Sequence, residues 1–184
     1  LTGLFNNRYL EDTLERELHR ARRVASGLVL IRIEPDQMSE FIRCHGAESA
    51  DRLLQCMADT LLRAFRSSDV CCRISEYGFG VLLSEAVLAD GTVRAEAMRG
   101  ELSELRIQRR GQTLGPVTVS AGLAAYPEQA STPQELFEAA ESAVTRARDE
   151  GGDATRVAER LPPPSPCLSE ASTKEPFDLG RANA

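Results

Sequence analysis

The sequence predicts a layered α+β domain in which helices flank a central, mostly antiparallel sheet. Apolar residues recur at helical spacing in four long segments, and short apolar runs rich in branched residues lie between them. One pair of these runs is separated only by a tight turn, which indicates a β-hairpin. The predicted order is therefore helix, strand, helix, hairpin, helix, strand, helix and a last strand.

The four long helices are predicted from their apolar faces. Those faces are formed by Leu10, Leu14, Leu18 and Ala21 in residues 7–23, by Ala50, Leu53, Leu54, Met57, Leu61 and Phe65 in 47–65, by Val93, Ala97, Leu102 and Leu105 in 90–105, and by Leu136, Phe137, Ala140, Ala143, Val144 and Ala147 in 132–150. The last helix has the clearest start, because Thr132 can cap it, Pro133 fits its first position and Glu135 completes a capping box. The mixed segment 34–46 is expected to include a shorter helix.

The strands are predicted at 28–33, within the hairpin 70–84, at 117–125 and at 155–158. The run 28–33 contains Arg32, and a charge inside an apolar run indicates a strand end near a site or near solvent. The hairpin has small or branched residues before its turn and an apolar run after it. The segment 155–158 is expected to form an edge strand.

The chain has 184 residues, which fits one domain at 1–160 and a Pro-rich linker or disordered tail at 161–184. The abrupt opening at Leu1 is typical of a piece cut from a longer protein. No apolar run approaches the length of a membrane span and no export leader is visible, so we expect a cytoplasmic domain without membrane insertion. The net charge of −6 argues against a general nucleic-acid surface.

The cysteines indicate a reducing compartment. Five are present, an odd number, at positions 44, 56, 71, 72 and 167, and no pair has zinc-ligand spacing. We therefore expect mostly buried free thiols, with Cys71 and Cys72 as core residues. His19 and His45 are expected to be exposed or structural, because no carboxylate or cysteine is spaced to work with them.

The most distinctive stretch lies around the hairpin turn. It contains Arg66-Ser-Ser-Asp69 and, beginning six residues after Asp69, the turn Ser75-Glu76-Tyr77-Gly78-Phe79. This register resembles the GGDEF family, the diguanylate cyclase domains, whose five-residue signature occupies that turn. Only the closing phenylalanine of the signature is kept, whereas the Arg-x-x-Asp pair that many members carry just upstream is intact.

Three further landmarks extend the resemblance over nearly all of residues 1–158. The opening block 1–10, Leu-Thr-Gly-Leu-Phe-Asn-Asn-Arg-Tyr-Leu, is similar to the family's Leu-Thr-Gly-Leu-x-Asn-Arg. The stretch 118–122 is similar to its Thr-Val-Ser-x-Gly strand, and Arg148-Asp-Glu-Gly151 to its Lys-x-x-Gly helix end. The resemblance implies a nucleotidyl-cyclase-like palm.

The resemblance also implies that catalysis has been lost. Family members use two Mg²⁺ ions, held by the first Asp of an Asp-x-Asp strand end and by the third signature position. Those positions are Arg32 and Tyr77 here, and an arginine places a positive charge where a cation should bind. Glu34 and Glu76 remain nearby, but we expect no Mg²⁺ and no catalytic residue.

Positions that the resemblance assigns to nucleotide binding are changed as well. The guanine-reading Asn and Asp correspond to Ile42 and Asp51, and the phosphate-binding Lys and Arg correspond to Arg148 and Gly152. Asp51 is more simply explained as a residue near the start of a helix.

Arg66 and Asp69 are the candidate ligand-binding residues. In the family this pair forms an inhibitory site for cyclic di-GMP, where the arginine reads a guanine edge or a phosphate and the aspartate accepts from guanine. A further arginine usually completes such a site, and Arg94 and Arg99 are the candidates. The simpler alternative is an ordinary solvated pair at a strand entry, which contributes little energy.

Three functions follow from the resemblance. The first is an inactive GGDEF domain that acts as a cyclic di-GMP receptor in bacterial second-messenger signalling. The alternative is a ligand-free module that holds a homodimer or a partner signalling domain. Residual cyclase activity is the third, and it would require metal at Glu34 and Glu76.

Overall fold

The computed structural model of the chain describes residues 1–109, 112–114 and 117–160. The helices are α1 (Asn7–Val24), α2 (Met38–His45), α3 (Ala47–Ala64), α4 (Leu88–Ser103) and α5 (Pro133–Asp149). The strands are β1 (Phe5–Asn6), β2 (Leu28–Pro35), β3 (Val70–Arg73), β4 (Phe79–Ser84), β5 (Ile107–Arg109), β6 (Gln112–Leu114), β7 (Val119–Tyr126) and β8 (Thr155–Val157). The expected tail at 161–184, with Cys167, lies outside the described residues.

A six-stranded sheet with the order β1-β3-β4-β2-β7-β8 forms the centre of the domain. The inner pairings β3–β4, β4–β2 and β2–β7 are antiparallel, and the two outermost pairings, β1–β3 and β7–β8, are parallel. The α+β class and the mostly antiparallel sheet are thus confirmed, and β8 is an edge strand as expected. β5 and β6 form a separate small hairpin.

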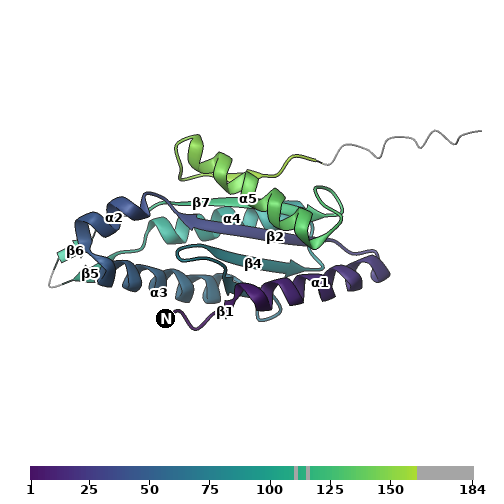
Figure 1. The fold of residues 1–184 in the computed structure, drawn as a ribbon, viewed down its shortest axis with the longest axis horizontal. Helices are drawn as coiled ribbons and strands as arrows, with labels where there is room; N and C mark the ends of the chain where they lie inside the picture. Colours follow the sequence, from purple (N-terminus) through teal and green to yellow (C-terminus); the bar gives the residue numbers. More distant parts are fainter. Residues whose placement is uncertain (110–111, 115–116, 161–184) are drawn as a thin grey trace, which may run out of the picture.

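Helices cover both faces of this sheet (Figure 1). Alternate residues of β2 point to opposite faces, as the pleat of a strand requires. Val29, Ile31 and Ile33 pack in one core cluster with residues of α3 and α4, whereas Leu28 and Leu30 pack in a second cluster with residues of α1 and α5. By the same alternation Arg32 and Glu34 lie on the face that α1 and α5 cover.

Two details of the sequence interpretation were wrong. β2 does not end near Arg32, which is the fifth of its eight residues. The buried face of α4 is formed by Gly91, Ala95, Met98 and Leu102, whereas Val93 is 70% exposed. The apolar pattern of α4 was misread because small residues, rather than the larger Val93, allow the helix to approach the sheet.

The sequence interpretation also missed β1 and the β5–β6 hairpin. These strands have only two or three residues each, which is too short for an alternating pattern. Among the described residues, no helix has the length and apolar character that crossing a membrane requires.

The cysteines differ in burial, and we therefore expect them to differ in reactivity. Burial raises the pKa of the Cys71 thiol to about 11, with Asp69 adding to it, and burial raises the pKa of Cys72 to about 12. Cys44, in contrast, is exposed. In a Cys167→Ser background at pH 8, a thiol reagent is expected to label Cys44 rapidly, and Cys71 and Cys72 only after unfolding.

The same pKa shifts predict the direction of a pH effect on stability. A thiol whose pKa is raised by folding stabilises the folded state at pH values below its ordinary pKa of 9.0. This contribution to stability is lost as the pH rises toward the folded-state pKa values of about 11 and about 12. Rapid labelling of Cys71 or Cys72 in the folded protein would contradict their placement in the core.

Candidate functional site

The turn between β3 and β4 is closed by contacts among its own residues. The backbone N–H of Ile74 donates to the Gly78 carbonyl at 3.0 Å, and the N–H of Gly78 donates to Ser75 Oγ at 2.9 Å. The hydroxyl of Tyr77 donates to Glu76 Oε1 at 2.7 Å, and this bond raises the pKa of Tyr77. Phe79 is fully buried in the core. The turn residues therefore satisfy one another, rather than leaving an open glycine backbone for a ligand.

Arg32 lies on β2 opposite Gly80 of β4, and it forms ion pairs. Its guanidinium is 3.0 Å from Glu34 Oε1 and 3.4 Å from Glu141 Oε1 on α5. The other oxygen of Glu34 is 2.7 Å from Nη1 of Arg148, also on α5. Glu34 is thus held between two arginines, and the side chains of Arg32 and Glu34 are only 17% and 18% exposed.

We call Arg32, Glu34, Glu141 and Arg148 the ion-pair cluster. The sequence interpretation singled out Arg32, Glu34 and Arg148 but missed Glu141. Its position seven residues before Arg148, two turns of one helix, could have indicated that both reach the same strand.

The ion-pair cluster does not fit a divalent cation. Mg²⁺ needs oxygen ligands with uncompensated negative charge, but both oxygens of Glu34 already contact guanidinium groups. Within the described ranges, no group of three or more His, Cys, Asp or Glu side chains could hold a metal.

The positions compared with the family's nucleotide readers do not form a common pocket. Ile42 is half-buried on α2 and packs against the core, and Asp51 is exposed in the second turn of α3. Gly152 has a positive φ of 74°, and its Cα approaches the Asp36 carboxylate so closely that a Cβ would lie 2.9 Å from it. A side chain in place of Gly152 would therefore collide with Asp36.

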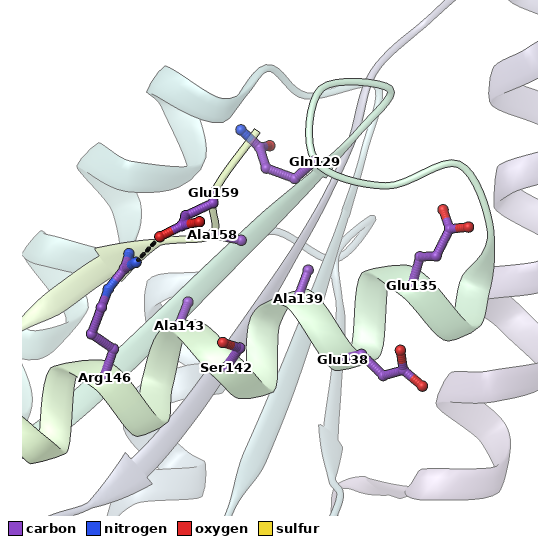
Figure 2. A pocket seen from close by; sticks show the side chains of 9 residues that line it. All are labelled: Gln129, Glu135, Glu138, Ala139, Ser142, Ala143, Arg146, Ala158 and Glu159. Atoms are coloured by element: carbon purple, nitrogen blue, oxygen red, sulfur yellow. Dashed lines mark hydrogen bonds and ion pairs between the residues drawn. The ribbon is translucent and has the colours of Figure 1, made fainter. Parts of the chain in front are cut away.

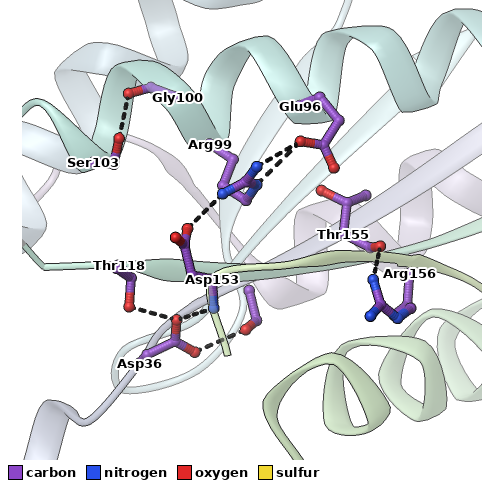
Figure 3. A network of polar contacts seen from close by, with 10 residues as sticks. Asp36, Glu96, Arg99, Gly100, Ser103, Thr118, Asp153, Thr155 and Arg156 are labelled. Atoms are coloured by element: carbon purple, nitrogen blue, oxygen red, sulfur yellow. Dashed lines mark hydrogen bonds and ion pairs between the residues drawn. The ribbon is translucent and has the colours of Figure 1, made fainter. Parts of the chain in front are cut away.

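Asp36 anchors a network that the sequence interpretation did not detect (Figure 3). Asp36 is 8% exposed, and its carboxylate accepts hydrogen bonds from Thr118 Oγ1, Ser120 Oγ and the backbone N–H of Asp153, all at 2.8 Å. These contacts connect the end of β2 with β7 and with the turn before β8. The carboxylate therefore has a structural role.

Replacing Asp36 with Asn is expected to destabilise the domain by about 2–3 kcal/mol. The NH₂ group of the amide would face groups that now donate hydrogen bonds to the carboxylate, and at least one of these donors would lose its acceptor. Urea unfolding measures this change. The matched control is Asp90→Asn, an exposed position in the first turn of α4, for which we expect a change within about 0.5 kcal/mol. Equal stability of the two variants would contradict the role of Asp36.

Arg66 and Asp69 form a closed turn between α3 and β3. The Asp69 N–H donates to the Arg66 carbonyl at 2.9 Å, and the Arg66 N–H donates to Asp69 Oδ2 at 2.8 Å. Arg66 is exposed, and its guanidinium has no hydrogen bond or ion pair to any described residue. The Asp69 side chain, by contrast, is only 4% exposed.

Of the two candidate arginines, the structure brings only Arg94 to this turn. Nη1 of Arg94 is 2.8 Å from Asp69 Oδ2, whereas Arg99 pairs with Glu96 and Asp153 in the network of Figure 3. Asp69 Oδ2 thus accepts two hydrogen bonds within the protein. No described residue donates to Oδ1.

A hollow of about 380 Å³ lies elsewhere, between α5 and residues 158–159 (Figure 2). Its polar groups are already engaged: Arg146 binds the Val157 carbonyl at 2.6 Å and Glu159 at 3.4 Å, and Gln129 accepts from the Ala125 N–H at 3.0 Å. It contains no residue that the sequence interpretation assigned to catalysis or to ligand binding, and it offers a charged ligand little.

Comparison with known proteins places these observations in a family. A family model described as the GGDEF domain of diguanylate cyclases matches residues 1–154, which is most of the chain. This chain belongs to the GGDEF family. The structural neighbours include the GGDEF domain of TpbB from Pseudomonas aeruginosa, with a TM-score of 0.83, 28% identity and coverage of 88% of this chain and all of that one.

Curated relatives include the diguanylate cyclase DgcP of Pseudomonas aeruginosa, 30% identical over 158 residues, and the response regulator PleD of Caulobacter vibrioides, 28% identical over 155. Those matches cover 86% and 84% of this GGDEF chain but only 23% of DgcP and 34% of PleD. A further solved relative, SiaD of Pseudomonas aeruginosa, is 27% identical with a TM-score of 0.80, covering 85% of this chain and 60% of that one. It was solved in complex with its activator SiaC.

The GGDEF domain of DgcB from Caulobacter crescentus, solved in complex with c-di-GMP, has a TM-score of 0.81 at 22% identity, covering 86% of this chain and 90% of that one. This likeness bears on the fold. The palm fold that the sequence resemblance implied is therefore confirmed.

Proposed function

We propose that this GGDEF domain does not synthesise cyclic di-GMP but binds it, and so acts as a regulatory module in bacterial second-messenger signalling. Loss of catalysis is supported by the ion-pair cluster, in which Arg32 supplies the positive charge that a metal would supply in an active relative. Arg66 and Asp69 would provide the ligand site. We place the domain in the cytoplasm, acting on an attached or partner domain.

The observation that carries the binding proposal is the contrast between the two side chains of the Arg66 turn. Asp69 is fixed by the backbone N–H of Arg66 and by Arg94, with Oδ1 still available as an acceptor. Arg66 is exposed and unpaired among the described residues, so its guanidinium can bind a phosphate or the O6/N7 edge of a guanine without first breaking an internal contact.

Titration calorimetry with cyclic di-GMP tests this function. The domain is expected to bind at low micromolar concentration or tighter, about −8 kcal/mol, and Arg66→Ala and Asp69→Ala are expected to abolish binding. Arg63→Ala is the matched control, because Arg63 is an exposed arginine at the end of α3 whose contact is with Thr60. Absence of binding by the unmodified domain would overturn the proposal.

The alternative is a ligand-free interaction module. The nearly complete burial of Asp69 in internal contacts favours it, because a carboxylate that is already paired has less to offer a ligand. The structure of SiaD with its activator is a precedent for a protein partner of this fold. Light scattering measures the molar mass of the domain with and without cyclic di-GMP and so distinguishes the two functions. Self-association that is the same in both conditions would support the alternative.

A further inference from the structure

We propose that the ring of Phe5 forms a base-stacking subsite beside Arg66, so that a guanine of the bound cyclic dinucleotide stacks against the N-terminal strand. This inference rests on the function proposed above and names a contact which that function does not require. A hollow of about 360 Å³ lies between β1, the end of α3 and the Arg66 turn. Its lining includes Phe5, Leu62, Phe65, Arg66, Ser67 and Asp69.

The chemistry of this hollow suits a planar, anionic ligand. Phe5, Leu62 and Phe65 supply apolar surface, and Phe5 and Leu62 remain 53% and 55% exposed. The one cationic side chain in the lining is Arg66, whose guanidinium is unpaired among the described residues. A flat apolar surface beside a free guanidinium is the combination that binds a nucleobase and its phosphate together.

Phe5 lies in ordered backbone, and its ring stacks on a second aromatic ring. Its backbone pairs with β3 opposite Cys72. The next residue, Asn6, caps α1 by accepting from the Tyr9 N–H at 2.9 Å. The Tyr9 ring stacks on the Phe5 ring with centroids 4.0 Å apart and planes 14° apart.

Tyr9 covers one face of the Phe5 ring but does not line the hollow, so the remaining side of the ring is the one that a base would meet. Because the Phe5 ring already stacks on Tyr9, a base that binds it removes less side-chain freedom than it would from an isolated ring. The contact would also attach the ligand to β1, the strand that leads into α1.

Calorimetry with cyclic di-GMP on three forms of the full chain tests the subsite. Phe5→Leu keeps apolar volume but removes the aromatic face, and is expected to weaken binding about tenfold. Phe5→Tyr keeps the ring and is expected to bind like the unmodified chain. Thermal melting checks that both variants fold, which the exposure of Phe5 favours.

A fluorescence measurement gives a second readout. The chain has no tryptophan, so Phe5→Trp introduces a single reporter whose emission is expected to be quenched by the stacked base. Val24→Trp, at an exposed position in the last turn of α1, is the control and should not respond. Unchanged affinity of Phe5→Leu, or no quenching of Phe5→Trp by a bound ligand, would overturn the subsite and leave the Arg66 function standing. Absence of binding by the unmodified chain would overturn both.

Discussion

Replacing both Arg32 and Tyr77 with aspartate is expected to give this domain a divalent-cation site. The two substitutions remove one of the two guanidinium groups that now contact Glu34, and they place carboxylates at the positions that the sequence resemblance assigns to metal binding in family members. At a Mg²⁺ concentration ten times its dissociation constant, binding would stabilise the variant by about 1.4 kcal/mol. For a chain of this size that is a rise of about 3–6 °C in melting temperature.

The test compares the melting temperature of each variant with and without Mg²⁺. When a chelator removes divalent cations, the Arg32→Asp/Tyr77→Asp variant should have a lower melting temperature than the unmodified domain. The reason is that the new carboxylates repel Glu34 and Glu141. Arg32→Ala/Tyr77→Ala is the matched control: it also breaks the ion pairs but adds no ligand, so Mg²⁺ should leave its melting temperature unchanged. A metal-dependent rise in the unmodified domain would contradict the proposed loss of the metal site.

Patterns that depend on neighbouring residues could be predicted from the sequence. The faces of α1, α3 and α5 follow from apolar spacing, and the start of α5 follows from a capping box that the structure forms as expected, with Glu135 N–H donating to Thr132 Oγ1 at 3.2 Å. The hairpin at 70–84 follows from two apolar runs around a turn. Each of these signals lies within about 20 residues of sequence.

The contacts of the candidate site could not be predicted, because they join residues distant in sequence. Asp36 accepts from Ser120 and from Asp153, and Glu34 pairs with Arg148. In the solvated pair that the sequence left open as an alternative, both side chains would face solvent, but only Arg66 is exposed. The spacing did not show that Arg94, 25 residues after Asp69 in the chain, donates a hydrogen bond to the Asp69 carboxylate and keeps it buried.

The position of Gly122 explains how Arg32 comes to lie within reach of α5. In the sheet, Arg32 lies opposite Gly80 on β4 and opposite Gly122 on β7. A Cβ on Gly122 would lie 2.3 Å from both the Ala140 carbonyl oxygen and the Val144 nitrogen of α5. The missing side chain therefore lets the backbone of α5 rest directly on the sheet, which brings Glu141 and Arg148 within reach of β2.

Gly122→Ala is accordingly expected to destabilise the domain by about 3 kcal/mol or more, because the added methyl group collides with helix backbone that cannot rotate away. Urea unfolding measures this loss. The matched control is Gly100→Ala on α4, where a Cβ meets nothing within 4 Å and the exposed helix should gain about 0.5–1 kcal/mol. If Gly122→Ala were as stable as Gly100→Ala, α5 would not rest on the sheet at this point. The ion pairs from Arg32 and Glu34 to α5 would then lack the close approach on which they depend.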